Sequence, residues 1–249
     1  MDKQKNSFYH AIKVNTDVCI GCSHCMKVCP TQAIRISGGH ARINKNRCID
    51  CGECYRVCPV NAIYVDQDDF KKRPEKKVKV LLVPSVFIGQ FPEIYTKDQI
   101  FETVKKQGFT HVFEVEQAVD AIIEFYKNYS ESDNKMPVIS TYCPAIVRLI
   151  QVAYPSLCDK FIPVKAPHDV TALYFREYFK KQGIDREDTE IFYITPCAAK
   201  IASVKEPVGE DSSEIDVVIN MNTLFNLVYS DLVNDSEGEC NSNIVSMNP

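Results

Sequence analysis

A cysteine pattern that occurs twice constrains this chain more than any other feature of its sequence. The run CIGCSHCMKVCP at residues 19–30 recurs as CIDCGECYRVCP at residues 48–59, with every cysteine shifted by 29 positions. Each copy reads C-x2-C-x2-C-x3-C-P. These runs hold eight of the twelve cysteines in the 249-residue chain. Because disulfides do not persist in a reducing compartment, such dense cysteine predicts metal binding.

The spacing indicates two iron–sulfur cubes that exchange one ligand. Three thiolates two residues apart on a tight loop can wrap one face of a cube, and the fourth, at the start of a short helix, points toward the other cube. Bacterial two-cluster ferredoxins have this spacing, and residues 10–66 resemble them. The predicted ligands are Cys19, Cys22, Cys25 and Cys58 for one [4Fe-4S] cluster, and Cys48, Cys51, Cys54 and Cys29 for the other.

Other residues of the two runs are expected to support the clusters. Gly21 and Gly52 would let the backbone approach closely and direct N–H groups at the sulfurs. We expect His24 to be a surface residue. Zinc is disfavoured, because its chemistry does not call for an interleaved pattern. The apolar shell that keeps water from the cubes is expected to contain Val28, Val57, Ile34 and Ile63.

Charge and hydropathy exclude several classes of protein. The net charge is −4, but the N-terminal third is basic and the remainder acidic. Basic charge can indicate nucleic acid, yet compensation for two anionic clusters explains it better, so no nucleic-acid partner is expected. Apolar runs such as residues 80–83 are far shorter than the roughly 20 residues that span a bilayer. With no signal-peptide core in residues 1–10, we expect a cytoplasmic protein without membrane contact.

The chain is predicted to have three parts. Residues 1–66 form an α+β ferredoxin-like two-cluster domain, residues 67–77 a charged linker, and residues 78–249 an α/β lobe with a mostly parallel sheet. Strands in the lobe are expected over residues 78–83, 110–115, 138–140, 190–195 and 216–219. Helices are expected near residues 97–107, 116–129, 145–154, 168–182 and 222–232. In such sheets, chemistry occurs beyond the carboxyl ends of the strands.

Two cysteines of the lobe are predicted to lie at such ends. Cys143 and Cys197 each follow a predicted strand and begin a helix, where the helix dipole stabilises a thiolate that can bind metal. The other two cysteines of the lobe lack that setting. We expect Cys158 to be a packed core thiol and Cys240 to lie in a polar tail.

These residues carry a second resemblance. The ferredoxin module, the run CPAIVRLI and the run TPCAAK resemble, in order and spacing, the C-terminal domain of the iron-only ([FeFe]) hydrogenase large subunit, especially its sensory or regulatory branch. In that family four cysteines hold a third cube, and one of them also bridges to a two-iron centre where protons are reduced or hydrogen is split. The resemblance places Cys143 and Cys197 on two of these cysteines, and Lys200 on a lysine that hydrogen-bonds a cyanide of the two-iron centre. It places Pro84 and Ser85 on the segment that lines this centre.

The chain also departs from the catalytic members of this family. Tyr142 replaces a cysteine that relays protons, and Ser203 replaces a glutamate of the proton path. The third motif, which supplies the last two cysteines, has no counterpart up to residue 249, so we expect the lobe to be a partial hydrogenase-like domain. An active hydrogenase is therefore disfavoured for this chain.

We expect an iron–sulfur protein in which two [4Fe-4S] clusters relay single electrons to or from the hydrogenase-like lobe or a partner. One alternative is a redox-sensing or hydrogen-sensing regulator with a third [4Fe-4S] cluster in the lobe. Another is a ferredoxin with a non-catalytic interaction domain, in which Cys143 and Cys197 are packed thiols. The expected partner is a redox protein or a downstream signalling domain, and oxygen-sensitive clusters favour anaerobic life.

Overall fold

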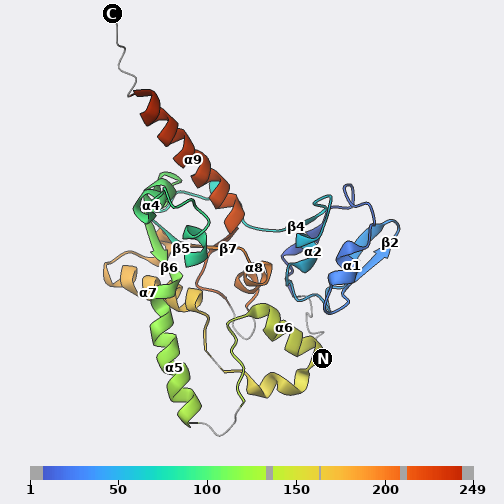
Figure 1. The fold of residues 1–249 in the computed structure, drawn as a ribbon. Coiled ribbons are helices and arrows are strands. Elements are labelled where there is room, and N and C mark those ends of the chain that lie inside the picture. The colour runs from blue at the N-terminus through green and yellow to red at the C-terminus, as the bar shows by residue number, and fades with distance from the viewer. Residues whose placement is uncertain (1–7, 133–136, 163, 208–211, 243–249) are drawn as a thin grey trace, which may run out of the picture.

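The computed structural model describes residues 8–132, 137–162, 164–207 and 212–242. The N-terminal region, residues 8–66, folds around the two cysteine runs, beside the larger lobe (Figure 1). It has two antiparallel two-stranded sheets, β1 with β4 and β2 with β3. Its elements are β1 (Ile12–Val14), α1 (His24–Val28), β2 (Ile34–Ser37), β3 (His40–Ile43), α2 (Glu53–Arg56) and β4 (Ile63–Val65). The predicted α+β character of this region is confirmed.

The sequence repeat extends to the backbone conformation. Three pairs of residues, each 29 positions apart, have positive φ angles, a conformation that few L-residues adopt. The pairs are Gly21 (64°) with Asp50 (51°), Ser23 (62°) with Gly52 (85°), and Gln32 (52°) with Asn61 (52°). The two glycines expected to support the clusters, Gly21 and Gly52, do not correspond to each other in the repeat. Each has a counterpart with a side chain in the other run.

The lobe is built on a four-stranded parallel sheet with the strand order β6-β5-β7-β8. Its strands are β5 (Val78–Val83), β6 (His111–Glu114), β7 (Thr189–Thr195) and β8 (Val217–Asn220). This confirms the predicted parallel sheet. The strand predicted over residues 138–140 is wrong, because only a single bridge joins Ile139 to Phe161 there. The Ile139 N–H donates to the Lys160 carbonyl at 2.7 Å, so this segment pairs away from the sheet.

Helices cover both faces of the sheet (Figure 1). The helical elements are η1 (Phe70–Lys72), α3 (Ser85–Ile88), α4 (Lys97–Lys106), η2 (Val115–Ala118), α5 (Val119–Ser132), α6 (Pro144–Ala153), η3 (Pro155–Lys160), α7 (Pro167–Lys181), η4 (Arg186–Asp188), α8 (Ala198–Lys205) and α9 (Met221–Ser242). One buried cluster joins alternate residues of β5 and β7 to α7, α8 and the interior of the N-terminal region. A second cluster joins the other side chains of these strands to α4 and α9.

The ends of the helices follow local signals in the sequence. A capping box between Thr96 and Gln99 begins α4, and Gly108, with φ 99°, follows its end. Pro167 begins α7, and Gly183, with φ 75°, lies just beyond it. The last helix, α9, continues ten residues beyond its predicted end at residue 232, so the polar segment that contains Cys240 is helical. The side chain of Cys240 lies outside the described residues.

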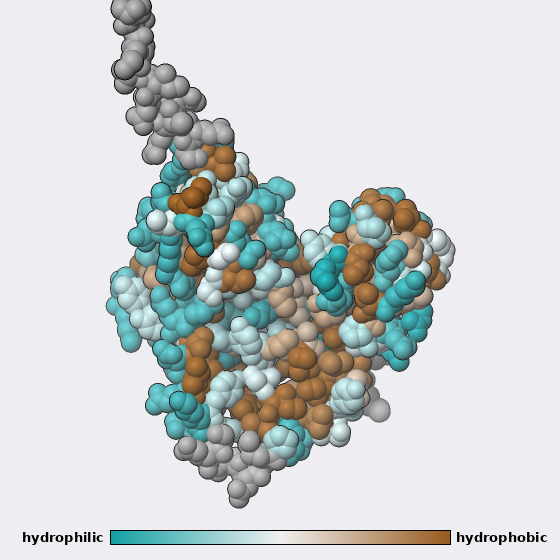
Figure 2. Space-filling view, viewed as in Figure 1, coloured by the Kyte–Doolittle hydropathy of each residue, from teal (hydrophilic) through white to brown (hydrophobic). Residues whose placement is uncertain are grey.

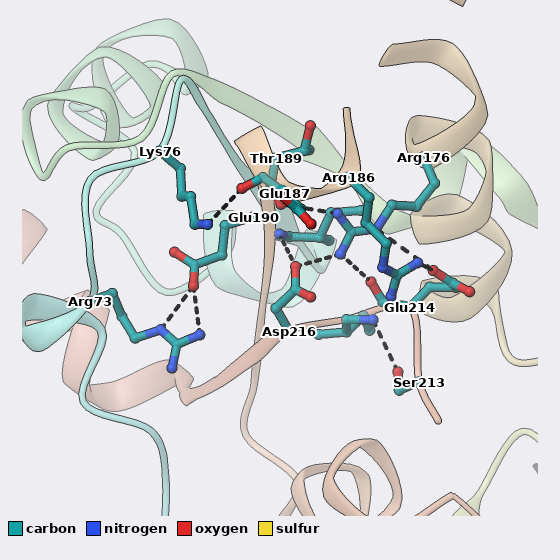
Figure 3. A network of polar contacts seen from close by, with 12 residues as sticks. Arg73, Lys76, Arg176, Arg186, Glu187, Thr189, Glu190, Ser213, Glu214 and Asp216 are labelled. Carbon is teal, nitrogen blue, oxygen red and sulfur yellow. Dashed lines mark hydrogen bonds and ion pairs between the residues drawn. The ribbon is translucent and has the colours of Figure 1, made fainter. Parts of the chain in front are cut away.

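The linker, residues 67–77, lies along the lobe through paired contacts. The Val218 N–H donates to Asp68 Oδ2 at 2.9 Å, and the Asp68 N–H donates to the Val218 carbonyl at 3.1 Å. Arg73 bonds Glu190 at the other end of the linker, with 2.6 Å between Nη2 and Oε1 (Figure 3). Glu190 is 3% exposed, so this ion pair ties the linker to a buried end of β7.

The surface is apolar where α6 and η3 lie. Figure 2 shows hydrophobic residues gathered in this part of the lobe. Large side chains exposed there include Ile146, Val152 and Leu157, at 42%, 37% and 40%. Smaller hydrophobic areas also appear on the N-terminal region and on the upper part of the lobe (Figure 2). Among the described residues, no helix has the length and apolar character needed to cross a membrane.

Candidate metal centres and the loops beside them

The structure gathers the eight N-terminal cysteines around two cavities. The first cavity is lined by Cys19, Cys22, Cys25 and Cys58. The second cavity is lined by Cys29, Cys48, Cys51 and Cys54. Each cavity thus takes three cysteines from one run and the last cysteine of the other. These are the two groups that the spacing predicted, although ligation itself stays a prediction.

Backbone donors accompany the cysteines that cross between the runs. The Ala33 N–H donates to Cys29 Sγ at 3.2 Å. The repeat-related Ala62 N–H donates to Cys58 Sγ at the same distance, 3.2 Å. Such N–H groups stabilise thiolate and sulfide charge in iron–sulfur sites. Four thiols around each cavity, with backbone donors to sulfur, fit a [4Fe-4S] cluster.

Apolar side chains close both cavities. The first cavity is also lined by Ile20, Ile36, Val60 and Ile63, and the second by Ile12, Ile34, Ile43 and Ile49. The prediction was therefore right for Ile34 and Ile63. It was wrong for Val28 and Val57, which line neither cavity. Each directly precedes a crossing cysteine, and consecutive side chains at the end of a helical turn point in different directions. His24 is exposed, as expected.

Burial makes these thiols poor acids before metal binds. It raises the pKa of Cys48 and of Cys54 to about 12. Asp50 adds to the effect at Cys48, and neighbouring cysteines add to it at Cys54. It also raises the pKa of Cys25 and Cys51 above the ordinary value. Because cluster ligands are thiolates, iron must displace protons from these groups when the cluster assembles.

A buried charged group, which the sequence analysis missed, adjoins the second cavity. Asp50 lines this cavity and is 1% exposed. Its Oδ2 lies 2.7 Å from His10 Nδ1 and 2.8 Å from Nη1 of Arg148, which belongs to α6 of the lobe. Asp50 Oδ1 accepts from the Ile12 N–H at 3.1 Å. Two features of the sequence point to this group. Asp50 occupies in the second run the position that Gly21 occupies in the first, and Arg148 is the lone arginine of the apolar run CPAIVRLI.

The lobe brings its two predicted site loops together. Cys143 caps the N-terminus of α6 and Cys197 that of α8, and both are half-buried. Lys200 Nζ donates to the Tyr142 hydroxyl at 3.1 Å and lies 4.2 Å from the centre of that ring. The loop that contains Cys143 therefore contacts the helix that follows Cys197.

Lys200 keeps its charge in this setting. Burial alone would lower its pKa, but Tyr193, Tyr142 and Cys197 outweigh burial, and the pKa of Lys200 is raised. An ammonium group thus stands between the two cysteine loops, where it would stabilise an anionic ligand or thiolate.

Pro84 and Ser85 follow β5 at the same edge of the sheet, because β5 and β7 are parallel neighbours. The Ser85 hydroxyl donates to Glu116 Oε1 at 3.0 Å. Glu116 in turn lines a cavity of about 340 Å³ together with Tyr142. The predicted site segments of the lobe therefore lie together at the carboxyl ends of the strands, as expected for chemistry in such a sheet.

Cys158 is not the packed core thiol that the sequence indicated. It lies in η3, a turn without buried residues, and is half-buried. The physical reason is that Tyr154 and Leu157 beside it are 56% and 40% exposed, so this apolar-looking segment lies on the surface.

Residues 76–242 match the family described as the iron-only hydrogenase large subunit, C-terminal domain, and the chain belongs to this family. Residues 11–59 match a 4Fe-4S dicluster domain, and a second such match covers residues 47–90. With eight cysteines around two cavities, these findings assign two [4Fe-4S] clusters to the chain. The protein thus contains iron–sulfur electron-transfer domains related to [FeFe] hydrogenase.

Individual relatives differ in function. The chain is 29% identical over 235 residues to the periplasmic [Fe] hydrogenase large subunit of Nitratidesulfovibrio vulgaris, covering 86% of this chain and 56% of that protein. It is 24% identical over 153 residues to a cytosolic Fe-S cluster assembly factor NAR1 homologue of Schizosaccharomyces japonicus, covering 54% of this chain and 29% of that protein. The chain thus spans about a third to a half of these relatives.

A solved [FeFe]-hydrogenase has the same fold. The two structures align with a TM-score of 0.52 and 24% sequence identity, over 66% of this chain and 45% of that chain. A likeness at this identity shows the fold and leaves the chemistry of the lobe open.

Proposed function

We propose that this protein is an electron relay in which two [4Fe-4S] clusters carry single electrons to or from the hydrogenase-like lobe or a redox partner. When bound, each cluster supplies a one-electron couple. The protein's own residues hold the clusters, keep water from them and fix their separation. The main support for this proposal is that each cavity has three cysteines from one run and a fourth from the other. Cys29 and Cys58 would therefore link the two cluster sites directly.

The ligand assignment is tested with single substitutions at the crossing positions. Cys29→Ala and Cys58→Ala are each expected to perturb both clusters, because each residue sits in the run of one cluster and binds the other. The measurement is the EPR spectrum of the reduced protein after anaerobic reconstitution. Cys158→Ala is the matched control, since this thiol lies in the lobe outside both cavities. Loss of one cluster with an unchanged signal from the other would contradict the crossed assignment.

Iron content separates the relay from the alternatives. About eight iron atoms and eight acid-labile sulfides per chain are expected for two four-iron clusters. About twelve would favour a sensor with a third cluster held partly by Cys143 and Cys197. Substituting both of these cysteines with alanine should then lower the count by about four. An unchanged count of eight would favour a lobe that acts as a relay partner or an interaction domain.

A further inference from the structure

We propose that Arg148 and Asp50 set the reduction potential of the second cluster, bound by Cys29, Cys48, Cys51 and Cys54, apart from that of the first. Arg148 would raise this potential and Asp50 would lower it. The lobe would thereby act on one of two clusters whose ligand runs are nearly identical. This inference rests on the proposed relay, because it requires two reversible one-electron couples and the crossed ligand assignment.

The geometry places a paired charge within the binding loop. Asp50 stands between Cys48 and Cys51, and its carboxylate is withdrawn from water. Its two oxygens accept from the Ile12 N–H and from Arg148, as described above, and Oδ2 also contacts His10. Salt screens such an enclosed pair much less than it screens a surface pair. The charges therefore act on the second cavity with little screening by salt.

Arg148 reaches this position from the other part of the molecule. Its side chain is 11% exposed, and the Nη1 atom also donates to the Tyr9 carbonyl at 3.3 Å. The guanidinium group lies 4.4 Å from the centre of the Phe8 ring. These contacts hold the cation against the N-terminal region, while α6 itself begins at Pro144 of the lobe, directly after Cys143.

The first cavity has no equivalent charge. The residue that corresponds to Asp50 in the repeat is Gly21, and the described lining of the first cavity contains no carboxylate and no arginine or lysine. The two runs supply the same ligands at the same spacing. The buried pair beside the second cavity is thus a structural difference that can separate two otherwise similar potentials.

The sign of each effect follows from charge. Reduction adds one negative charge to a cluster, so a nearby cation favours the reduced state and a nearby anion disfavours it. Arg148→Met removes the arginine charge beside Asp50 and should lower the second potential. Asp50→Asn leaves Arg148 uncompensated and should raise it. Asparagine tolerates the positive φ of 51° at this position, so the loop conformation is retained.

The experiment is an anaerobic redox titration of the full, cluster-loaded protein, followed by EPR, with iron content measured on every sample. Each single variant is expected to change the ratio of reduced to oxidised second cluster at least tenfold at a given potential. For a one-electron couple this corresponds to a shift of 59 mV in the midpoint potential. The shifts should be opposite in sign. The other cluster should shift by less than half as much. The double variant should return close to the native potential.

Arg56→Met is the matched control. Arg56 lies two residues after Cys54 and bonds Glu53 at 2.7 Å. Glu53 also lines the second cavity, but the side chains of this pair are 72% and 42% exposed. Solvent and salt screen this charge, so neither potential should move. Arg148→Lys, which keeps the positive charge, should stay nearer the native value than Arg148→Met. If Arg148→Met loses iron, Asp50→Asn and Arg148→Lys still test the sign and the charge dependence.

The outcomes separate this inference from the proposed function. Shifts of equal sign in the two single variants, or unmoved potentials at full iron content, would overturn the role of the pair and leave the relay intact. A native protein without two reversible couples would instead overturn the relay itself.

Discussion

The N-terminal region and the lobe both place cysteines at or near the starts of helices, but the cysteines have different surroundings in the two regions. In the N-terminal region eight thiols enclose two cavities, and four thiols face each cavity. In the lobe two thiols cap neighbouring helices beside a parallel sheet in which the inner strand β7 is buried along its whole length. The first region is organised around sites for metal, and the second around an apolar interior. Their stabilities should therefore depend on different conditions.

The largest difference between the two regions is expected when iron is removed. The N-terminal region buries few side chains beyond those next to its cysteines, and small domains of this kind gain their folding free energy from metal. Chelation under reducing conditions is expected to unfold residues 11–66 and leave the lobe folded. Amide hydrogen exchange followed by mass spectrometry would detect loss of protection in β1 to β4 alone.

Cys143→Ala provides the control for that measurement. The substituted protein should lose protection in the same N-terminal segments and to the same extent, because its eight N-terminal thiols are intact. Simultaneous loss of protection in β5 and β7 after chelation would contradict the independence of the lobe.

An effect of intermediate size is expected from two glycine substitutions, one in each cysteine run. A Cβ on Gly21 would lie 2.5 Å from the carbonyl oxygen of Gly39, whereas a Cβ on Gly52 meets nothing within 4 Å. Both residues have positive φ, which costs an alanine about 1–2 kcal/mol. We expect Gly21→Ala to lose about 3 kcal/mol of stability and Gly52→Ala about 1 kcal/mol. The midpoint of anaerobic urea unfolding, followed by cluster absorbance, measures the difference, and equal midpoints would refute it.

The smallest expected effect is specific to the lobe. His168 is 2% exposed and stacks on Tyr193 with 4.7 Å between ring centres. Burial, reinforced by the positive charge of Lys200, lowers the pKa of His168 to about 3. Below about pH 6.5, His168 therefore binds a proton in the unfolded chain but stays neutral in the folded chain. The free energy of unfolding then falls as the pH decreases toward 3.

Between about pH 7.5 and pH 5.5 this group should remove about 1 kcal/mol, or about 3 °C of melting temperature. His168→Phe retains an aromatic ring but cannot titrate, so its melting temperature should fall less over this interval. Scanning calorimetry at the two pH values measures the contrast. An identical decrease in both proteins would rule out His168 as its source.

Local patterns in the sequence were sufficient for much of this architecture. The repeated cysteine spacing predicted which thiols gather, and the apolar run at residues 78–83 predicted the inner strand β5. The capping signals around α4 also acted locally. The strand predicted at residues 138–140 failed because β-branched residues there pair with residues 160–162 instead of joining the sheet. Composition indicates a strand but does not select its partner.

The charged group at the second cavity could not be derived from the sequence in this way. Asp50 and Arg148 are 98 positions apart, and nothing in either local pattern identifies the other as its partner. The repeat marks Asp50 as unusual only through its counterpart, Gly21. The contact depends on how the lobe packs against the N-terminal region, which is a property of the whole fold.

The linker has a consequence for association between copies of the protein. β8 is an edge strand, and the free N–H and C=O groups of such an edge can pair with another chain and start aggregation. Gln67 and Asp68 occupy part of this edge, since the Asn220 N–H donates to Gln67 Oε1 at 2.6 Å and Val218 exchanges bonds with Asp68. The segment that joins the two regions thus also shields the β8 side of the sheet from pairing with another copy.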